Sequence, residues 1–305
     1  MSGDRRSYGA LSLRAFFDDQ LHHLQTLLAS LNSHIQEKEQ QTKEDRQIVE
    51  SFVDASNSKM RAVHGYSHKL REHVRGLYNH VLEVAEQIPP PVSLNLDAFS
   101  TDPLINALFV NNNDIDRLFK ADSDVNAYLR VHSKYQVPVL YGLLTASKSE
   151  KRILGIGRQG DMLIREVPQQ VVNFSSYKIH TPCADSAELS AALKEYLFGR
   201  VVALVKQEMI ARRINQSSTA GNGSYESQVK SLANPDVYLD VLIKYLENPV
   251  SLLSVDKIHF KLSKFGVKLD DDDSQSANEF DIHELTWSNN TRNVMLQIAH
   301  TRQVE

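Results

Sequence analysis

The sequence is short of cysteine and of long apolar runs, and each shortage excludes a class of protein. Cys183 is the only thiol in 305 residues, so the chain can build neither a disulfide framework of its own nor a zinc site with several cysteine ligands. No window reaches the ~18 uncharged apolar residues of a transmembrane helix. No apolar core with a small-residue cleavage site follows the start. We therefore expect a cytoplasmic protein with no membrane partner.

Positive charge is also too scarce for a uniformly basic nucleic-acid-binding protein. The 34 lysines and arginines face 38 aspartates and glutamates, which gives a formal net charge of −4. A dedicated DNA-binding domain normally carries a basic stripe, so nucleic acid is an unlikely partner unless one local face is basic. The composition, with 41% hydrophobic and 24% charged residues, is that of a globular protein long enough for two or three domains.

Two seven-residue repeats occupy the N-terminal third and predict helices with one apolar stripe each. The first repeat covers residues 11–53 and the second covers residues 60–88. Polar residues interrupt the first stripe at Lys38, Thr42 and Asp45. The second stripe consists of Met60, Val63, Ser67, Leu70, Val74, Leu77, Val81, Val84 and Ile88.

The segment 54–58 between the repeats predicts a turn. Its Asp, Ser and Asn side chains compete with a helix by bonding to their own backbone, although one continuous helix with a stutter is the alternative. If the chain turns back near residue 55 or 56, Asp45 lies opposite the neighbourhood of Ser67. The polar residues of the first stripe then face the polar residue of the second. We therefore predict a long antiparallel, coiled-coil-like helical hairpin. In it, Leu24, Leu28 and Leu31 should pack against Leu77, Val81 and Val84.

After the prolines at 89–91 the pattern becomes that of an α+β protein. Helical periodicity is followed by short β-branched segments separated by turn residues, which predict an antiparallel meander of four strands. A run of small polar residues then predicts a linker, and further strands follow one more helix. The predicted organisation is a helical hairpin arm over residues 11–88, an α+β domain over 97–213 with the meander at 137–180, a flexible linker at 215–228, and a small α+β domain with C-terminal antiparallel strands over 231–305.

A glycine motif at residues 155–160 matches the G-x-G-x-x-G pattern of dinucleotide sites. Such a site needs a helix directly after the motif, because the helix N-terminus receives the pyrophosphate. Residues 161–167 predict a strand instead, with Gln159, Gly160 and Asp161 as a hairpin turn. We therefore expect no nucleotide cofactor here.

Histidine and cysteine give two further candidates, each with a simpler interpretation. His64 and His68 are four residues apart and could share a helix face, but a solvated polar layer is the simpler interpretation. His180 and Cys183 could form a nucleophile pair, whereas a lone cysteine is usually a small buried apolar residue. We predict neither a metal site nor a catalytic pair.

Acidic and basic clusters are equally unspecific. The acidic run at 270–273 lacks the glycine and the terminal glutamate of a calcium loop. Asp281 and Glu284 have the odd spacing that places them on opposite faces of a strand. A modest basic excess marks the meander and more often protects a sheet edge than binds nucleic acid. Its members are Lys148, Lys151, Arg152, Arg158, Arg165 and Lys178.

The long apolar stripe, set against the absence of a catalytic motif, favours a non-enzymatic interaction or adaptor protein. The helical arm would bind a protein partner or a second copy of the chain. Phe16, Leu27 and Tyr78 lie beside the stripe and would widen its apolar surface, unless the body of the protein covers it. The alternatives are a hydrolase or nuclease whose site assembles only in three dimensions, and nucleic-acid binding through the basic meander.

Overall fold

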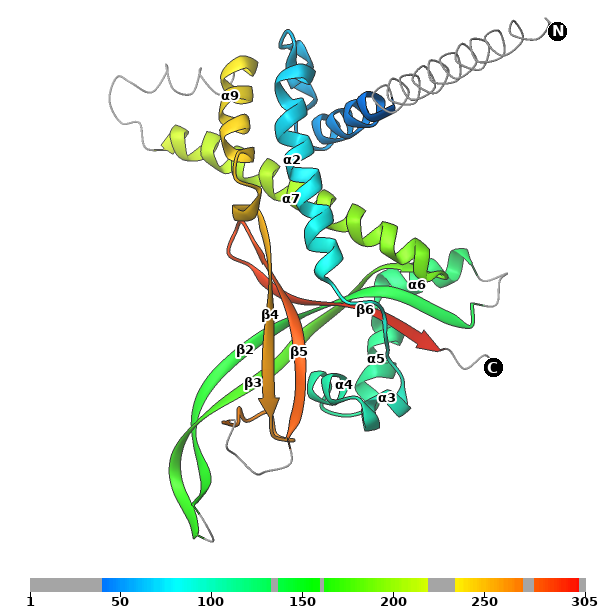
Figure 1. The fold of residues 1–305 in the computed structure, drawn as a ribbon, viewed down its shortest axis with the longest axis vertical. Helices are drawn as coiled ribbons and strands as arrows, with labels where there is room; N and C mark the ends of the chain where they lie inside the picture. The colour runs from blue at the N-terminus through cyan, green and yellow to red at the C-terminus, as the bar shows by residue number, and fades with distance from the viewer. Residues whose placement is uncertain (1–39, 133–136, 160–161, 219–233, 271–276, 302–305) are drawn as a thin grey trace, which may run out of the picture.

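The computed structural model describes residues 40–132, 137–159, 162–218, 234–270 and 277–301. Within them lies one antiparallel sheet with helices on both faces, and two of its strands extend into a long ribbon (Figure 1). The elements are a helix over 40–56, η1 (Ser58–Ala62), α2 (Tyr66–Gln87), β1 (Val92–Ser93), α3 (Leu96–Thr101), α4 (Pro103–Leu108), α5 (Asn113–Ala121), α6 (Ser123–Val131), β2 (Val139–Gln159), β3 (Met162–Cys183), α7 (Ser186–Ser218), α9 (Pro235–Leu246), η2 (Pro249–Ser251), β4 (Leu253–Leu262), β5 (Asn278–Trp287) and β6 (Arg292–Thr301). The predicted α+β class is therefore confirmed.

The strand order is β3-β2-β6-β5-β4, and β1 adds a short parallel pairing to β6. Strands from both sides of residues 215–228 lie in this sheet, because β2 is hydrogen-bonded to β6. The regions 97–213 and 231–305 therefore share one sheet. Helix α7 continues to Ser218, so it includes the first residues of the predicted linker. The remainder of that linker lies outside the described residues.

The predicted meander of four short strands is wrong in one respect, because 137–180 contains two long strands. β2 and β3 have 21 and 22 residues and pair almost throughout. The pairing register shifts at Thr145/Ser147 and at Gly155/Ile156. Such shifts are typical of β-bulges, where one strand has an extra residue. Pro168 is tolerated within β3 because β3 is an edge strand. Residues typical of turns therefore did not end the strands.

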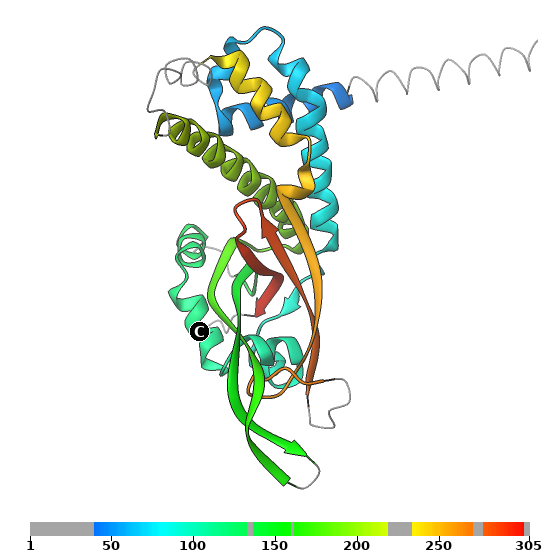
Figure 2. The ribbon, with the colours of Figure 1, turned by 90° about the vertical axis from the view of Figure 1, so that its left-hand side faces the viewer.

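Two apolar cores lie on opposite faces of the sheet, and neighbouring residues of β2 show this directly. Leu143 belongs to the core that includes residues of α2, α7 and α9, whereas Leu144 belongs to the core that includes residues of α3 to α6. Successive side chains of a strand point to opposite faces, so helices cover both faces of the sheet. The ribbon formed by the far ends of β2 and β3 extends beyond these helices (Figures 1 and 2).

The predicted break between the two N-terminal repeats is confirmed. The helix over 40–56 ends at Ser56, whose hydroxyl donates to the Phe52 carbonyl at 2.7 Å. Asn57 then caps η1 by accepting from the Lys59 backbone N–H at 3.1 Å. Residues 50–60 are therefore not one uninterrupted helix.

The second stripe packs against more than the first repeat. All of the apolar members of the second stripe are buried, and they share one core with α7, α9 and the first-repeat residues Val49, Phe52 and Val53. The helix over 40–56 crosses α2 instead of lying along it (Figures 1 and 2). Asp45 meets Arg75 at 3.3 Å, about two helical turns beyond Ser67. Leu24, Leu28 and Leu31 lie outside the described residues, so a full-length hairpin stays a prediction.

Candidate interaction surface

The histidine pair does not share a helix face. His64 precedes α2, and Gly65 adopts a left-handed backbone with φ 72° between His64 and the first helical residue, Tyr66. Both histidines are exposed, as the solvated interpretation predicts. Among the described residues, no group of three or more His, Cys, Asp or Glu side chains could hold a metal ion.

His180 and Cys183 have separate partners. The His180 ring lies 3.1 Å from the Thr145 hydroxyl and packs in a tilted arrangement against Tyr196 of α7, with 4.7 Å between the ring centroids. Cys183 is buried in the core, where its thiol donates to the Asp185 carbonyl at 3.4 Å. Burial raises the pKa of Cys183 to about 11 and lowers the pKa of His180. The thiol therefore stays protonated near neutral pH, and this geometry gives it a packing role.

Asp281 and Glu284 lie on opposite faces of β5, as their spacing predicted. Asp281 accepts from Lys257 at 2.8 Å and from the His259 ring at 2.9 Å on the exposed face. Both hydrogen bonds lower the pKa of Asp281, and the one from Lys257 has the larger effect. Glu284 is buried and lies 3.4 Å from the Lys148 ammonium. Of the acidic run, residues 271–273 lie outside the described residues.

The described residues of the glycine motif, 155–159, form the end of β2. β2 ends at Gln159 and β3 begins at Met162, so a strand and not a helix follows the glycines. The antiparallel pairing that the hairpin requires is confirmed as far as Gln159 and Met162, whereas Gly160 and Asp161 lie outside the described residues. The described residues after the motif do not form the helix N-terminus that a dinucleotide pyrophosphate requires.

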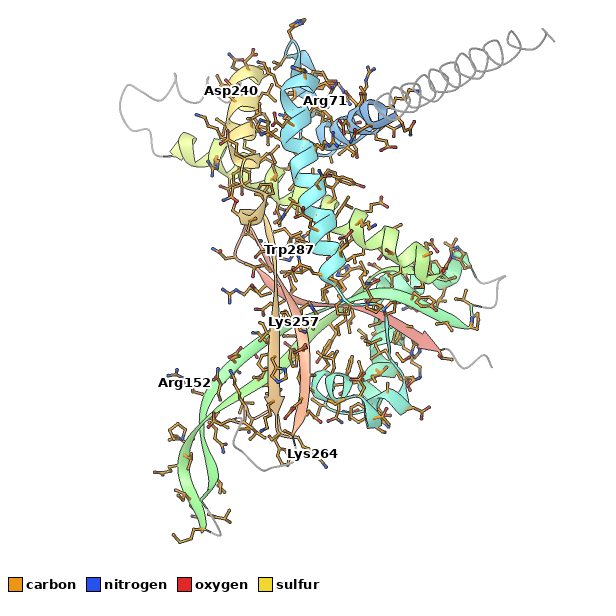
Figure 3. All side chains as sticks on the ribbon, viewed as in Figure 1. Arg71, Arg152, Asp240, Lys257, Lys264 and Trp287 are labelled. Carbon is orange, nitrogen blue, oxygen red and sulfur yellow. The ribbon has the colours of Figure 1, made fainter. Side chains whose placement is uncertain are left out.

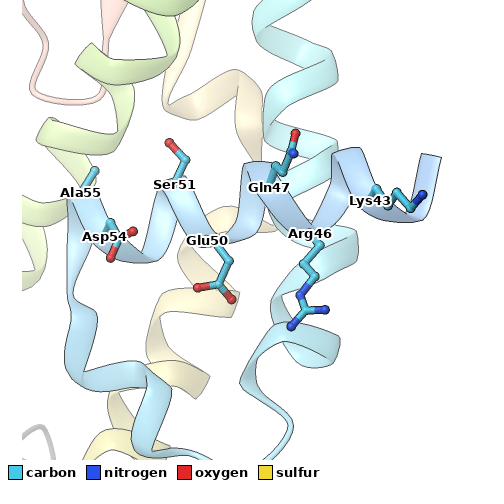
Figure 4. Close-up of a pocket in the computed structure, with 7 residues that line it drawn as sticks. All are labelled: Lys43, Arg46, Gln47, Glu50, Ser51, Asp54 and Ala55. Atoms are coloured by element: carbon cyan, nitrogen blue, oxygen red, sulfur yellow. The ribbon is translucent and has the colours of Figure 1, made fainter. Parts of the chain in front are cut away.

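Two hollows lie on the helical end of the molecule. One, of about 920 Å³, is an open hollow along one side of the helix over 40–56 (Figure 4). Its carboxylates are already engaged, because Glu50 and Asp54 both accept from Arg61 at 2.7 Å. The Tyr66 hydroxyl and then Arg61 lower the pKa of Glu50 by hydrogen bonding. This network ties the break at Asn57 to the start of α2.

A second hollow, of about 420 Å³, separates that helix from α2. Arg71 and Arg75 line it together with Asp45. Charges of both signs line this hollow, and the Asp45–Arg75 pair spans it. This ion pair links the two crossing helices at the surface, beside the buried contacts that Val49, Phe52 and Val53 make in the core.

The ribbon leaves the sheet at a defined point. Ala146 is the last residue of β2 that pairs with β6, opposite Val294. Val172 and Gln170 of β3 are then held by the loop after β4, through Val172 N–H to the Gly266 carbonyl and Lys268 N–H to the Gln170 carbonyl, both 2.8 Å. Beyond this point β2 and β3 pair with each other. We call residues 151–169 the ribbon end; its side chains are described for 151–156 and 162–169.

The ribbon end exposes large aliphatic side chains on both of its faces. Six of the eleven exposed large apolar residues of the described chain gather here. Leu154 and Ile156 share a face with their cross-strand partners Pro168 and Arg165, and Ile153 lies on the other face opposite Gln169. Their exposed fractions are 45% for Ile153, 70% for Leu154, 62% for Ile156, 71% for Met162, 74% for Leu163 and 40% for Ile164.

Charged residues lie among these aliphatic side chains. Lys151, Arg152 and Arg165 are exposed, and so is Glu166. Glu166 has φ 61° where the β2–β3 register shifts. The sequence did carry a signal for this surface: in a strand, the consecutive apolar residues 153–154 and 162–164 must point to both faces.

Of the three predicted interaction residues, only Tyr78 lies in the described part of the chain. Its ring packs edge-on against Phe198 of α7, with 5.4 Å between the ring centroids. Tyr78 therefore contributes to the packing of α2 on α7. Phe16 and Leu27 lie outside the described residues.

Comparisons with known proteins provide no assignment. No family model, no curated protein and no solved structure matches the chain. None of the helices in the described residues combines the length and the apolar character needed to cross a bilayer. The function must therefore be inferred from the surfaces of the molecule itself.

Proposed function

We propose that this chain is a non-enzymatic protein-interaction protein and that the ribbon end is a binding element. The observation that carries the proposal is the set of six exposed aliphatic side chains on both faces of a projecting two-stranded ribbon. Apolar surface gathered in this way marks interaction sites on soluble proteins. It stands apart from the body, so a partner can contact both faces (Figure 3, near Arg152).

The physical state of the ribbon supports the proposal. A two-stranded hairpin alone in water is marginally stable, and a stable one normally packs against further strands or a helix. The ribbon end has eight or nine residues per strand beyond its last contact with the body, roughly 30 Å at 3.3 Å per residue. A partner that covers its aliphatic side chains would supply the missing packing.

The helical arm remains a second element of the same proposal. Binding through Phe16 and Leu27 rests on the heptad pattern of the sequence alone. The apolar stripe of α2 is unavailable for binding, because it is buried in one core with the helix over 40–56, α7 and α9. A partner that binds through Phe16 and Leu27 would contact residues that precede the break at Asn57.

Two other functions are weaker. For the enzyme alternative, two of the charged clusters in the described chain are ion pairs, Lys148 with Glu284 and Lys257 with Asp281. For nucleic-acid binding, Lys151, Arg152 and Arg165 provide cations, but residues 151–169 contain no aromatic side chain on which a base could stack.

Photo-crosslinking tests the proposal directly. Benzoylphenylalanine replaces Leu163 in the full chain, and a matched variant carries it at Val110, which is 92% exposed in the loop after α4. We expect a discrete protein adduct in cells from position 163 and none from position 110. No adduct at 163, or an adduct to nucleic acid only, would refute a protein-binding role for the ribbon end.

A further inference from the structure

We infer that one face of the ribbon end binds an acidic amphipathic helix of a partner protein. The face consists of Arg152, Leu154, Ile156, Leu163 and Arg165, and we call it the arginine face. This inference rests on the proposed function and names the chemistry of its partner. The charges of the face indicate an acidic partner, and its strand geometry favours a helical one.

The pairing of β2 with β3 brings aliphatic and cationic side chains together on the arginine face. Arg152, Leu154 and Ile156 alternate along β2 and therefore point to the same side. Arg165 pairs with Ile156, and Leu163 lies two residues before Arg165 on that side. Exposed fractions of 62% to 74% on the three aliphatic side chains leave on the order of 300 Å² of apolar surface, the size of patch that often has a binding role.

The charge of the ribbon end is positive. Over its described residues, the cations Lys151, Arg152 and Arg165 outnumber Glu166, which the register shift leaves without a cross-strand partner. Within the described residues, neither Arg152 nor Arg165 has an ion pair or a side-chain hydrogen bond. Carboxylates of a partner would supply charge-assisted hydrogen bonds to both arginines, whereas a cationic partner would be repelled.

The opposite face of the ribbon is partly occupied by the protein itself. The Gln169 side chain lies over Gly155 and donates to a β2 carbonyl at 3.0 Å. Ile153 and Ile164 on this face are 45% and 40% exposed, less than the three aliphatic residues of the arginine face, although Met162 beside the turn is 71% exposed. The arginine face is therefore the more open of the two.

A helix suits this face better than an added strand suits its edges. Pro168 lacks the backbone N–H that an added strand would need, and the register shift at Glu166 bends the ladder. A two-stranded ribbon gains stability when a helix packs against it, as helices do on both faces of the remaining sheet. Arg152 lies four residues before the partner of Arg165, about 13 Å along the strand. Two turns of a helix span about 11 Å, so carboxylates two turns apart would reach both arginines.

A bilayer and a nucleic acid fit the arginine face less well. Arg165 and Glu166 lie nearer the turn than Leu154 does. Insertion deep enough to bury Leu154 would therefore carry both charges into the hydrocarbon, where a charge is costly. A nucleic acid would pair with the arginines through its phosphates, but residues 151–169 contain no aromatic side chain on which its bases could stack.

Fluorescence anisotropy of the full chain with two matched peptides tests the inference. Each peptide is an alanine-based helix about 18 residues long with one leucine stripe. One peptide has glutamates two turns apart beside the stripe, and the other has lysines at the same positions. We expect the glutamate peptide to bind at least about tenfold more tightly than the lysine peptide. Equal affinities, tighter binding of the lysine peptide, or binding of neither peptide would overturn the inference.

Reversing the charge of the arginine face should reverse this preference. Arg152→Glu/Arg165→Glu should weaken the glutamate peptide by roughly tenfold or more and strengthen the lysine peptide. Lys151→Glu is the matched control, because Lys151 is exposed on the opposite face, and it should keep the preference for glutamate. All substituted side chains are exposed, so circular dichroism should show an unchanged fold. A preference that survives the double reversal, or that Lys151→Glu abolishes, would contradict binding at the arginine face.

Photo-crosslinking from position 163 in cells separates this inference from the proposed function. We expect the protein adduct to disappear in Arg152→Glu/Arg165→Glu and to remain in Lys151→Glu. An adduct that persists in the double reversal would overturn only the acidic helix, whereas the absence of a protein adduct from the wild type would overturn both. Binding of the wild type, but not of the double reversal, to phosphatidylserine vesicles or to a single-stranded oligonucleotide, without a preference for the glutamate peptide, would replace the helix with that ligand.

Discussion

The joint between the body and the ribbon contains an ion pair whose two partners should contribute unequally to stability. The Lys148 ammonium lies 3.0 Å from Glu150 and 3.4 Å from Glu284. The Glu284 side chain is 5% exposed and the Glu150 side chain is 32% exposed. Lys148 thus has two carboxylate partners, Glu150 and Glu284. Among the described residues, the cation within ion-pair distance of Glu284 is Lys148.

Removing the cation should therefore be more harmful than removing the buried carboxylate. Lys148→Met leaves Glu284 buried and uncompensated, which should lower the free energy of unfolding by about 3–5 kcal/mol. Glu284→Leu leaves Lys148 paired with the more exposed Glu150, so we expect a loss of about 1–3 kcal/mol. The double variant should be more stable than Lys148→Met alone, because no buried charge then lacks a partner.

Urea unfolding at one protein concentration measures these differences. The single tryptophan, Trp287, is buried in the core, so its fluorescence reports on unfolding. If the dependence of the unfolding free energy on urea concentration is the same in each variant, the midpoints can be compared directly. Lys257→Met is the matched control, because Lys257 is 63% exposed in its pair with Asp281 and should matter by at most about 1 kcal/mol. Equal losses for Lys148→Met and Lys257→Met, or strict additivity in the double variant, would refute the reasoning.

Three further predictions follow from buried or paired groups. Leu77→Ala should lower the free energy of unfolding by about 2–5 kcal/mol, because Leu77 is fully buried in the core with α7 and α9; a loss below about 1 kcal/mol in urea unfolding would contradict that packing. The pKa of Glu50 is lowered by the Tyr66 hydroxyl and Arg61. Its stabilising contribution should be complete above the ordinary pKa of ~4.3 and be lost as pH falls through the lower folded value. Glu50→Gln should therefore flatten the acid side of a stability–pH curve, and an unchanged curve would argue against the network. Cys183, with its pKa raised to about 11 by burial, should resist alkylation by iodoacetamide at pH 8 in the folded chain and react once urea unfolds it; rapid labelling of the folded chain would place the thiol at the surface.

Local patterns in the sequence predicted the elements that depend on local interactions. The stripe from Met60 to Ile88 is buried throughout its apolar positions, and the helix breaks at Asn57, close to where Asp, Ser and Asn compete with helical hydrogen bonds. The strand after the glycine motif likewise excluded the dinucleotide interpretation. In each case, neighbours within a few residues decide the backbone conformation.

Contacts between distant segments decided the rest. Nothing in a heptad pattern states which surface buries it, and here α7 and α9 cover α2 although they begin more than 100 residues later. Residues typical of turns, such as Pro168, remained inside β3 because an edge strand tolerates a missing donor. The exposure of Leu154 and Leu163 is a tertiary property too: the same apolar residues would be core if the helices reached this far. Periodicity is a local property of the chain, whereas burial depends on which other segments arrive, and only the folded structure specifies that.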